Sequence, residues 1–309
     1  MKNIINYYYN FNLESVEENK YYCCFQYCDE VFYFVFFNRT KEELNDIVNI
    51  ITELKQKNIK IHDIILNRNR ELITKVGDKE YVLLKLNINK TQKIDFIDMC
   101  EIANKLKLNG KNSKLYRNNW GELWSKKVDY LEYQISELGK DKNIILNSFS
   151  YYLGLAENAI SYVNKINKTI RISAQDNITL SHRRIFFPNT ALNYFNPLSY
   201  IFDLEIRDIS EYIKMGFFNE EDSLLDLKTY LKLKRLTPYS YHMLYARLIY
   251  PSYYFDLFEE VMNNNENEEK ILKIINKVNE YEWFLKQTYE EISKYTNLEK
   301  IDWILKKES

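Results

Sequence analysis

The hydrophobic pattern changes period twice within the first 88 residues, and this change limits the folds that the chain can adopt. Two runs, KYYCCFQY (20–27) and VFYFVFF (31–37), are rich in aromatic and β-branched residues and are separated by a short polar link. Such a pair predicts a β-hairpin. The next segment, 40–58, opens with a Ser/Thr-x-x-Glu capping box from Thr40 to Glu43 and repeats its apolar residues at helical spacing.

Three short apolar runs follow this helix, at 62–67, 71–76 and 80–86, with Gly77 and Asp78 in the last link. They predict further strands joined by a turn. The order of strands, helix and strands therefore predicts a small, β-rich N-terminal lobe with one main helix over residues 1–88.

Residues 89–309 are predicted to form a larger and mainly helical lobe. Apolar residues recur at steps of three and four between 120 and 138, and again between 147 and 167, so we expect two long helices that pack together. The segment 268–307 also has a helical pattern, and 262–270 has the polar composition of a solvated loop. We predict an α+β, kinase-like, two-lobed fold.

Composition excludes several classes of function. The 309 residues are 46% hydrophobic, which suits a chain with a large core, and the formal net charge is −1. A nucleic-acid-binding domain would normally be strongly basic, so no nucleic-acid partner is expected. The first 20 residues lack a continuous apolar signal sequence, and no stretch has the length of a transmembrane segment. We expect a protein made in the cytoplasm.

The segment SHRRIFFPN (181–189) carries the most informative motif. His182 and Asn189 have the spacing of a phosphotransferase catalytic loop, His-x-Asp-x-x-x-x-Asn, but Arg184 stands where the acid would be. Two strand-like runs, 169–173 and 178–181, precede the loop. A third, 198–202, ends at Asp203, and Asp208 opens a helix.

Phosphoryl transfer needs a carboxylate base, an Asn and an Asp for magnesium, a lysine for the phosphates and a loop that covers them. Asn189 and Asp203 are present, so they are candidate, vestigial metal ligands. Arg184 cannot accept a proton. No lysine occurs between Lys20 and Lys41, and the first glycine of the chain is Gly77, so the small lobe lacks both phosphate-binding elements.

The segments 119–138, 148–160, 180–189, 196–214 and 243–260 resemble the YutH-type branch of the spore-coat kinase-like proteins, which is related to the CotS type. The resemblance implies an aminoglycoside-phosphotransferase-like fold, deposition in the bacterial spore coat, and coat or envelope proteins as partners. By position, Arg184 matches the catalytic Asp, Asn189 the magnesium Asn and Asp203 the metal Asp. Asp208 matches the residue that braces the catalytic loop.

The loop residues have competing interpretations. His182 is predicted to be a structural histidine. Arg183 and Arg184 could bind an anion, because guanidinium groups suit bidentate recognition. The alternative that we favour is an internal salt bridge from Arg184 to Asp203 or Asp208, which would place a fixed cation at the magnesium position.

Other polar and aromatic residues have simpler interpretations. Cys23, Cys24, Cys28 and Cys100 lack the spacing of a zinc site and are predicted to be buried thiols. The aromatic segment 250–258 could form an interaction surface, but core packing is the favoured interpretation. His62 and His242 are predicted to be structural.

Three hypotheses follow from the sequence. The favoured one is a catalytically inactive kinase-like protein, or pseudokinase, that acts in binding or assembly. The second is an atypical small-molecule phosphotransferase that uses ATP and magnesium, with Glu205 or Asp208 as the base. The third is an anion or phosphopeptide sensor that uses Arg183 and Arg184.

Overall fold

The computed structural model describes residues 1–19, 22–89, 91–108, 110, 112–139, 141–264 and 266–306. The backbone forms two compact units. The first contains Met1–Leu106, Gly110–Tyr116 and Pro188–Ile201, and the second contains Lys107–Asn109, Arg117–Phe187 and Phe202–Ser309. The predicted lobe boundary at residues 88 and 89 stays a prediction, and each unit is described by itself.

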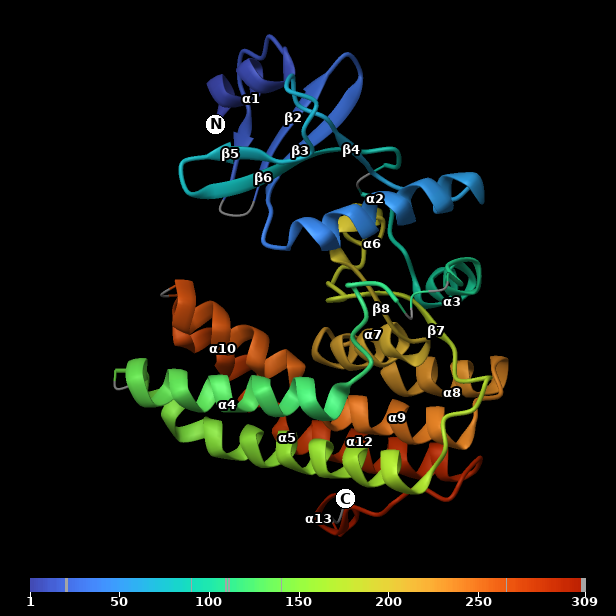
Figure 1. Ribbon diagram of the computed structural model, residues 1–309. Coiled ribbons are helices and arrows are strands. Elements are labelled where there is room, and N and C mark those ends of the chain that lie inside the picture. Colours follow the sequence, from blue (N-terminus) through green and yellow to red (C-terminus); the bar gives the residue numbers. More distant parts are fainter. Residues whose placement is uncertain are drawn as a thin grey trace. The chain divides into compact units, whose positions relative to one another are not determined.

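The first unit is built on an antiparallel sheet with the strand order β1-β2-β3-β6-β4, and β5 pairs with β6 (Figure 1). Helices α1, α2, α3 and α6 and the 3₁₀ turn η1 complete it. The bounds are α1 Lys2–Tyr9, β1 Glu17–Glu18, β2 Tyr22–Tyr27, β3 Glu30–Phe36, α2 Lys41–Gln56, β4 Asp63–Ile65, β5 Thr74–Val76, β6 Lys79–Lys85, α3 Phe96–Lys105, α6 Ala191–Tyr194 and η1 Pro197–Ser199.

The predicted hairpin is confirmed as β2 and β3, which pair Cys24 with Tyr33. Its two turn residues, Cys28 and Asp29, have φ of 47° and 62°, the left-handed conformation that tight hairpin turns require. The second predicted turn is also confirmed, because Gly77 lies between β5 and β6 with φ of 60°. Residues 20 and 21, at the start of the predicted first strand, lie outside the described residues.

Both faces of the sheet are buried. Phe34 and Leu83 pack on one face with Ile5 of α1, and Tyr33 and Leu84 pack on the other with Leu44 of α2. Successive strand residues point to opposite faces, so the adjacent thiols of Cys23 and Cys24 are buried on different sides. The prediction of buried thiols is wrong for Cys28, which is exposed in the hairpin turn, and Cys100 is half-buried. None of these four described cysteines forms a disulfide.

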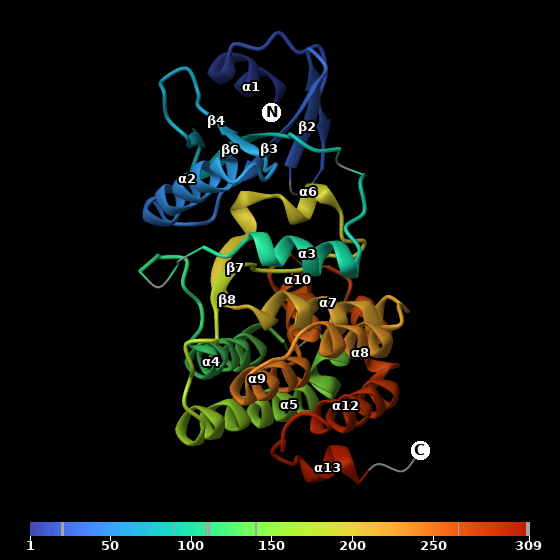
Figure 2. The same cartoon turned by 90° about the vertical axis from the view of Figure 1, so that its right-hand side faces the viewer.

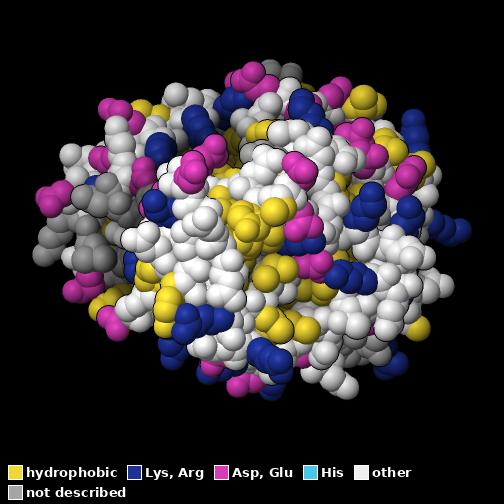
Figure 3. All heavy atoms as spheres, turned by 90° about the horizontal axis from the view of Figure 1, so that it is seen from above, with side chains coloured by type: hydrophobic (Ala, Val, Ile, Leu, Met, Phe, Trp, Pro, Cys, Tyr) yellow, Lys and Arg dark blue, Asp and Glu magenta, His cyan; other side chains and the backbone are white. Residues whose placement is uncertain are grey.

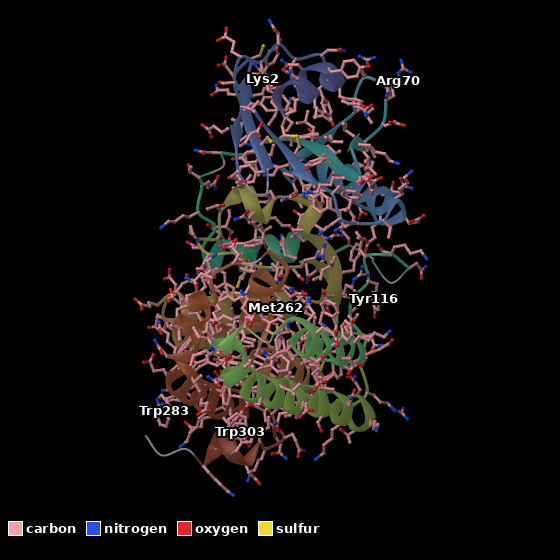
Figure 4. All side chains as sticks on the ribbon, turned by 90° about the vertical axis from the view of Figure 1, so that its left-hand side faces the viewer. Lys2, Arg70, Tyr116, Met262, Trp283 and Trp303 are labelled. Carbon is pink, nitrogen blue, oxygen red and sulfur yellow. The ribbon has the colours of Figure 1, made fainter. Side chains whose placement is uncertain are left out.

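The link between β4 and β5 is ordered by one buried side chain. Asn67 accepts hydrogen bonds from the backbone N–H groups of Asn69 and Glu71, and its amide donates to the carbonyl of Ile73. Arg70 lies at the tip of this loop with φ of 63°, and Figure 4 shows it directed away from the sheet.

The second unit is mainly helical, with a two-stranded sheet of β7 and β8 that leads into α7. Helix α4 packs against α5, and α9 packs against α5, α7 and α12 (Figure 2). The bounds are α4 Trp120–Leu138, α5 Asn143–Thr169, β7 Ile178–His182, β8 Tyr200–Leu204, α7 Ile206–Phe218, α8 Ser223–Leu233, α9 Pro238–Ile249, α10 Ser252–Asn264, η2 Glu268–Ile271, α11 Leu272–Ile275, α12 Val278–Ser293 and α13 Asp302–Leu305.

The two long predicted helices are confirmed as α4 and α5, and the predicted apolar residues Trp120, Trp124 and Leu131 are buried. The predicted strand at 169–173 is wrong, because α5 continues to Thr169 and residues 170–173 form no strand. No helix in the described part of the chain combines the length and apolar character needed to cross a bilayer.

The loop predicted at 262–270 is shorter than expected. Helix α10 continues to Asn264 and η2 begins at Glu268, while residue 265 lies outside the described residues. The carboxylate of Glu268 accepts hydrogen bonds from the backbone N–H groups of Ile144 and Ile145 and so caps the start of α5. The helical pattern at 268–307 is divided among η2, α11, α12 and α13, and residue 307 is not described.

The capping box at the start of α2 yields a stability prediction. Thr40 Oγ1 accepts the N–H of Glu43, and the Glu43 carboxylate accepts the N–H of Thr40. We expect Thr40→Ala to lower the free energy of unfolding by about 1 kcal/mol, because one helix N–H loses its acceptor. Thr40→Ser keeps the hydroxyl and should stay close to the wild type in urea unfolding. Equal losses in both variants would contradict the capping role.

The buried tyrosines predict sensitivity to alkali. Burial raises the phenolic pKa of eight described tyrosines in the second unit, to about 12 for Tyr254. The others are Tyr151, Tyr152, Tyr162, Tyr245, Tyr250, Tyr253 and Tyr281. Because the unfolded chain loses these protons near pH 10 while the folded chain keeps them, stability is full below about pH 10 and falls above it.

We expect the free energy of unfolding to fall by about 1.4 kcal/mol per pH unit for each such group above pH 10. The check is urea unfolding at increasing pH, combined with tyrosinate absorbance. The buried rings should titrate only with unfolding. Titration of the buried rings while the circular dichroism stays native would disprove this.

Candidate functional site

The candidate site lies in the second unit, where β7 ends at His182 and α7 begins after β8. The imidazole of His182 is 1% exposed. Its Nδ1 lies 2.6 Å from Oδ2 of Asp208, and its backbone N–H donates to Oδ1 of the same carboxylate at 2.9 Å. Asp208, in the first turn of α7, therefore fixes both the ring and the backbone of His182.

Asp203 is fully buried at the end of β8. Trp120 Nε1 donates to both carboxylate oxygens at 2.9 Å, and Arg207 donates to Oδ2 at 2.7 Å. The backbone N–H of Leu204 donates to Oδ1 at 2.8 Å. Burial raises the pKa of this carboxyl, whereas the charges of Arg207 and Arg247 oppose that rise. Both oxygens thus face donors supplied by the chain itself.

Arg207 connects Asp203 to the loop after β7. Its Nε donates to the carbonyl of His182 at 2.9 Å, and one terminal nitrogen donates to the carbonyl of Arg183 at 3.1 Å. Burial lowers the pKa of Arg207 to about 10, so the guanidinium is still charged at neutral pH. One buried cation therefore holds a carboxylate and two loop carbonyls.

The predicted salt bridge from Arg184 to Asp203 or Asp208 is wrong. Arg184 forms a bidentate pair with Asp256 of α10, with N–O distances of 2.5 and 2.6 Å, and it also donates to the carbonyl of Arg183. Its side chain is 40% exposed, whereas that of Asp203 is completely buried. Arg207 was missed in the sequence because Asp203 lies in β8 and Arg207 in α7, so the spacing rule for ion pairs within one helix does not apply to this pair.

A second buried ion cluster continues along α7. The Glu211 carboxylate accepts hydrogen bonds from Lys214 at 3.0 Å, from Arg247 of α9 at 2.6 Å and from the hydroxyl of Ser252 at 3.0 Å. Lys214 also donates to the carbonyls of Arg247 and Tyr250. Each of its three protons thus has an acceptor.

The pKa shifts follow from this arrangement. Burial alone would raise the pKa of Glu211, but Lys214, Arg247 and Arg207 outweigh it and hold that pKa well below the usual range. Burial lowers the pKa of Lys214 to about 8, against the attraction of Glu211. Three carboxylates, Asp203, Asp208 and Glu211, thus stand beside three cations, Arg207, Lys214 and Arg247, which leaves no net charge in this group.

Aromatic rings surround the cluster. Trp120 stacks on Trp124 at 5.3 Å, Trp124 stacks on Tyr250 at 4.1 Å, and the Arg247 guanidinium lies 5.0 Å from the Trp120 ring. The favoured interpretation of the segment 250–258 as core is confirmed, because all five of its aromatic residues are buried: Tyr250, Tyr253, Tyr254, Phe255 and Phe258.

The remaining predicted residues have other contacts. Asn189 belongs to the first unit, is buried, and donates from its amide to the carbonyl of Ile94 at 3.2 Å. His242 is buried with Nδ1 2.7 Å from the hydroxyl of Tyr162, and burial lowers the pKa of His62 to about 4. Among the described residues, no group of three His, Cys, Asp or Glu side chains could hold a metal ion.

Comparison with solved structures shows the fold. An aminoglycoside phosphotransferase from Alicyclobacillus acidocaldarius matches with a TM-score of 0.63 at 8% identity, over 95% of this chain and 96% of that chain. The AMP-bound complex of a spectinomycin phosphotransferase matches with a TM-score of 0.57 at 13% identity, over 96% and 97% of the chains. The predicted kinase-like fold, with a small antiparallel sheet and a larger helical region, is confirmed.

Comparison of sequences shows the family. The family described as "Spore coat putative kinase YutH" matches residues 2–288. The endospore coat-associated protein YutH of Bacillus subtilis (strain 168) is 32% identical over 193 residues, which are 55% of this chain and 56% of that protein. The match thus spans about half the length of this curated relative. The chain belongs to the YutH family of spore coat kinase-like proteins.

Proposed function

We propose that this protein is a catalytically inactive kinase-like component of the spore coat that acts by binding and assembly. It is made in the cytoplasm and deposited in the coat with other coat proteins. The coat association comes from the family. The proposal of inactivity rests on one observation above all: the Asp203 carboxylate is completely buried and saturated by Trp120, Arg207 and the N–H of Leu204.

The surroundings of Asp203 do not fit magnesium. This ion requires oxygen ligands at about 2.0–2.1 Å in octahedral geometry and keeps several waters. Oδ2 already accepts the guanidinium of Arg207 at 2.7 Å, and both oxygens accept the indole N–H of Trp120. A divalent cation would have to displace a buried positive charge that is also bonded to two loop carbonyls, so we derive no catalytic step through a metal here.

No described residue of the loop replaces the carboxylate that acts as the general base in phosphoryl transfer. Arg184 stands at the position of the acid and is paired with Asp256. The alternative bases are also engaged, because Glu205 is paired with Lys234 and both oxygens of Asp208 contact His182. A positioned base contributes about 10²–10⁴ to the rate, and no described residue of the loop is free to supply it.

The anion sensor is supported less well than assembly. Arg184 forms a bidentate pair with Asp256 through two nitrogens of its guanidinium group. Bidentate binding of an anion would need the same group. The small lobe adds nothing for a nucleotide, since β3 contains no lysine and no glycine precedes Gly77. ATP and magnesium would enter only under the alternative of an atypical phosphotransferase.

Asp203→Ala tests whether this residue has a structural role. We expect the free energy of unfolding to fall by about 3–5 kcal/mol, because Arg207 is left buried without its anion. Asp129→Ala, at an exposed position on α4, is the matched control and should change stability by less than about 0.5 kcal/mol. Urea unfolding gives both values.

A second measurement uses the wild-type protein, so it does not depend on whether Asp203→Ala folds. Millimolar ATP with magnesium should leave the melting temperature of the wild type unchanged, because a ligand that does not bind the folded state cannot stabilise it. A magnesium-dependent rise in melting temperature, accompanied by phosphate transfer, would refute the inactive assignment.

Restoring the acid gives a second test. Arg184→Asp returns a carboxylate to the loop position, but it places that group beside Asp256 and removes a half-exposed pair. We expect no phosphotransfer and a loss of about 1 kcal/mol in unfolding free energy. The charge swap Arg184→Asp with Asp256→Arg should recover part of that loss. Nucleotide turnover in Arg184→Asp would mean that only the base had been missing.

A further inference from the structure

A cavity of about 1190 Å³ lies in the second unit, outside the cluster around Asp203. Its walls come from the segment after α5, the end of α8, the start of α9 and the end of α12. It is larger than the 300–1,000 Å³ typical of small-molecule sites, so its size suits an extended ligand.

The charge of this cavity is one-sided. Four cations line it, namely Arg171, Lys232, Arg235 and Lys294, against one carboxylate, Asp176. Lys294 is paired with Glu291. Within the described ranges, the exposed cations Arg171, Lys232 and Arg235 have no ion-pair partner. By contrast, basic and acidic side chains are interspersed on the face of the molecule drawn in Figure 3.

The single carboxylate is occupied by the chain itself. Asp176 is 7% exposed, and it accepts hydrogen bonds from the backbone N–H of Ser173 at 2.6 Å and from the hydroxyls of Ser240 and Thr237. It therefore ties the segment after α5 to the first turn of α9. Because Asp176 is turned toward these donors, it does not neutralise the three exposed cations by direct pairing.

The cavity also offers aromatic and apolar contacts. Tyr239, Tyr241 and Tyr295 line it, and the rings of Tyr241 and Tyr295 stack at 5.7 Å. Tyr295 is 47% exposed, and Pro238, which also lines the cavity, is exposed. A ligand with negative charges alone would leave these surfaces uncovered, whereas an acidic segment with aromatic or apolar side chains would use both.

We propose that this cavity is a docking site for an acidic peptide segment of a partner protein, held by Arg171, Lys232 and Arg235 and by the exposed surfaces of Tyr295 and Pro238. Charge complementarity and size favour this occupant. Nucleic acid is disfavoured, because the whole chain has a net charge of −1. The proposal deepens the assembly role and rests on it, but it needs no statement about catalysis.

The test uses the full-length protein and a fluorescent peptide of alternating glutamate and tyrosine, with binding followed by anisotropy. The control peptide replaces glutamate by glutamine. We expect the acidic peptide alone to bind, with an affinity that falls as salt rises. Arg171→Glu with Arg235→Glu should weaken binding about tenfold or more, since two attractive charges become repulsive.

Lys273→Glu with Lys300→Glu is the matched control, because both lysines are exposed, belong to the same unit and lie outside the cavity lining. It should bind the peptide like the wild type, and both double variants should keep the wild-type melting temperature. Equal binding of the glutamine peptide, or equal weakening by both double variants, would overturn the proposal.

Two further outcomes separate the possible explanations. Binding of inorganic polyphosphate or of anionic lipid vesicles, but not of the acidic peptide, would overturn the peptide site. All binding is measured without nucleotide, so phosphotransfer in a separate assay would refute the inactive assignment while leaving a positive peptide result intact. Failure of peptide binding would leave the inactive assignment standing.

Discussion

The buried pair of Asp203 and Arg207 is the interaction on which the centre of the helical unit depends. Burying an isolated charge costs several kcal/mol, so each partner is tolerated only because the other is present and its remaining hydrogen bonds are made. Trp120 brings α4 to the carboxylate, and Arg207 carries the contact to the carbonyls of His182 and Arg183. One ion pair thereby joins β8, α4, α7 and the end of β7.

The cluster around Glu211 extends this arrangement to the neighbouring helices. Arg207, Glu211 and Lys214 follow one another at helical spacing on α7, and Glu211 is bonded to Arg247 of α9 and to Ser252 at the start of α10. Lys214 is completely buried, and its protons reach the carbonyls at the end of α9. Since each ion depends on its neighbours, a change at one of them affects the packing of several helices.

These two clusters show where sequence reasoning succeeds and where it stops. The hairpin of β2 and β3, the capping box at Thr40 and the helices α4 and α5 are encoded by local patterns of turn residues and apolar spacing. The charged residues Arg207, Glu211 and Lys214 on α7 also form a local pattern. Charges at helical spacing, however, normally indicate a solvated helix face. Arg207, Glu211 and Lys214 are buried because other elements, among them α8 and α9, pack against α7.

The choice of partner for Arg184 was equally beyond local pattern. Asp203 and Asp208 were the predicted partners, whereas the actual partner, Asp256, lies 72 residues away in the chain. The strand predicted at 169–173 was wrong for another reason. The β-branched residues of this segment favour a strand. In the structure, α5 extends to Thr169 and Arg171 is exposed. Arg171 is one of the cations that line the cavity proposed as a docking site.

The proposed replacement of a metal ion by a guanidinium at Asp203 would change how such a fold is used. In phosphotransferases, magnesium neutralises phosphate charge and bridges the nucleotide to the protein. Arg207 is bonded to the chain and charged at neutral pH, so it neutralises Asp203 at all times and without a ligand. A scaffold whose central carboxylate is permanently compensated needs no nucleotide to order that part of the helical unit. That property would suit the proposed assembly role, because a surface that is ordered without nucleotide would be available to a partner whatever the nucleotide supply.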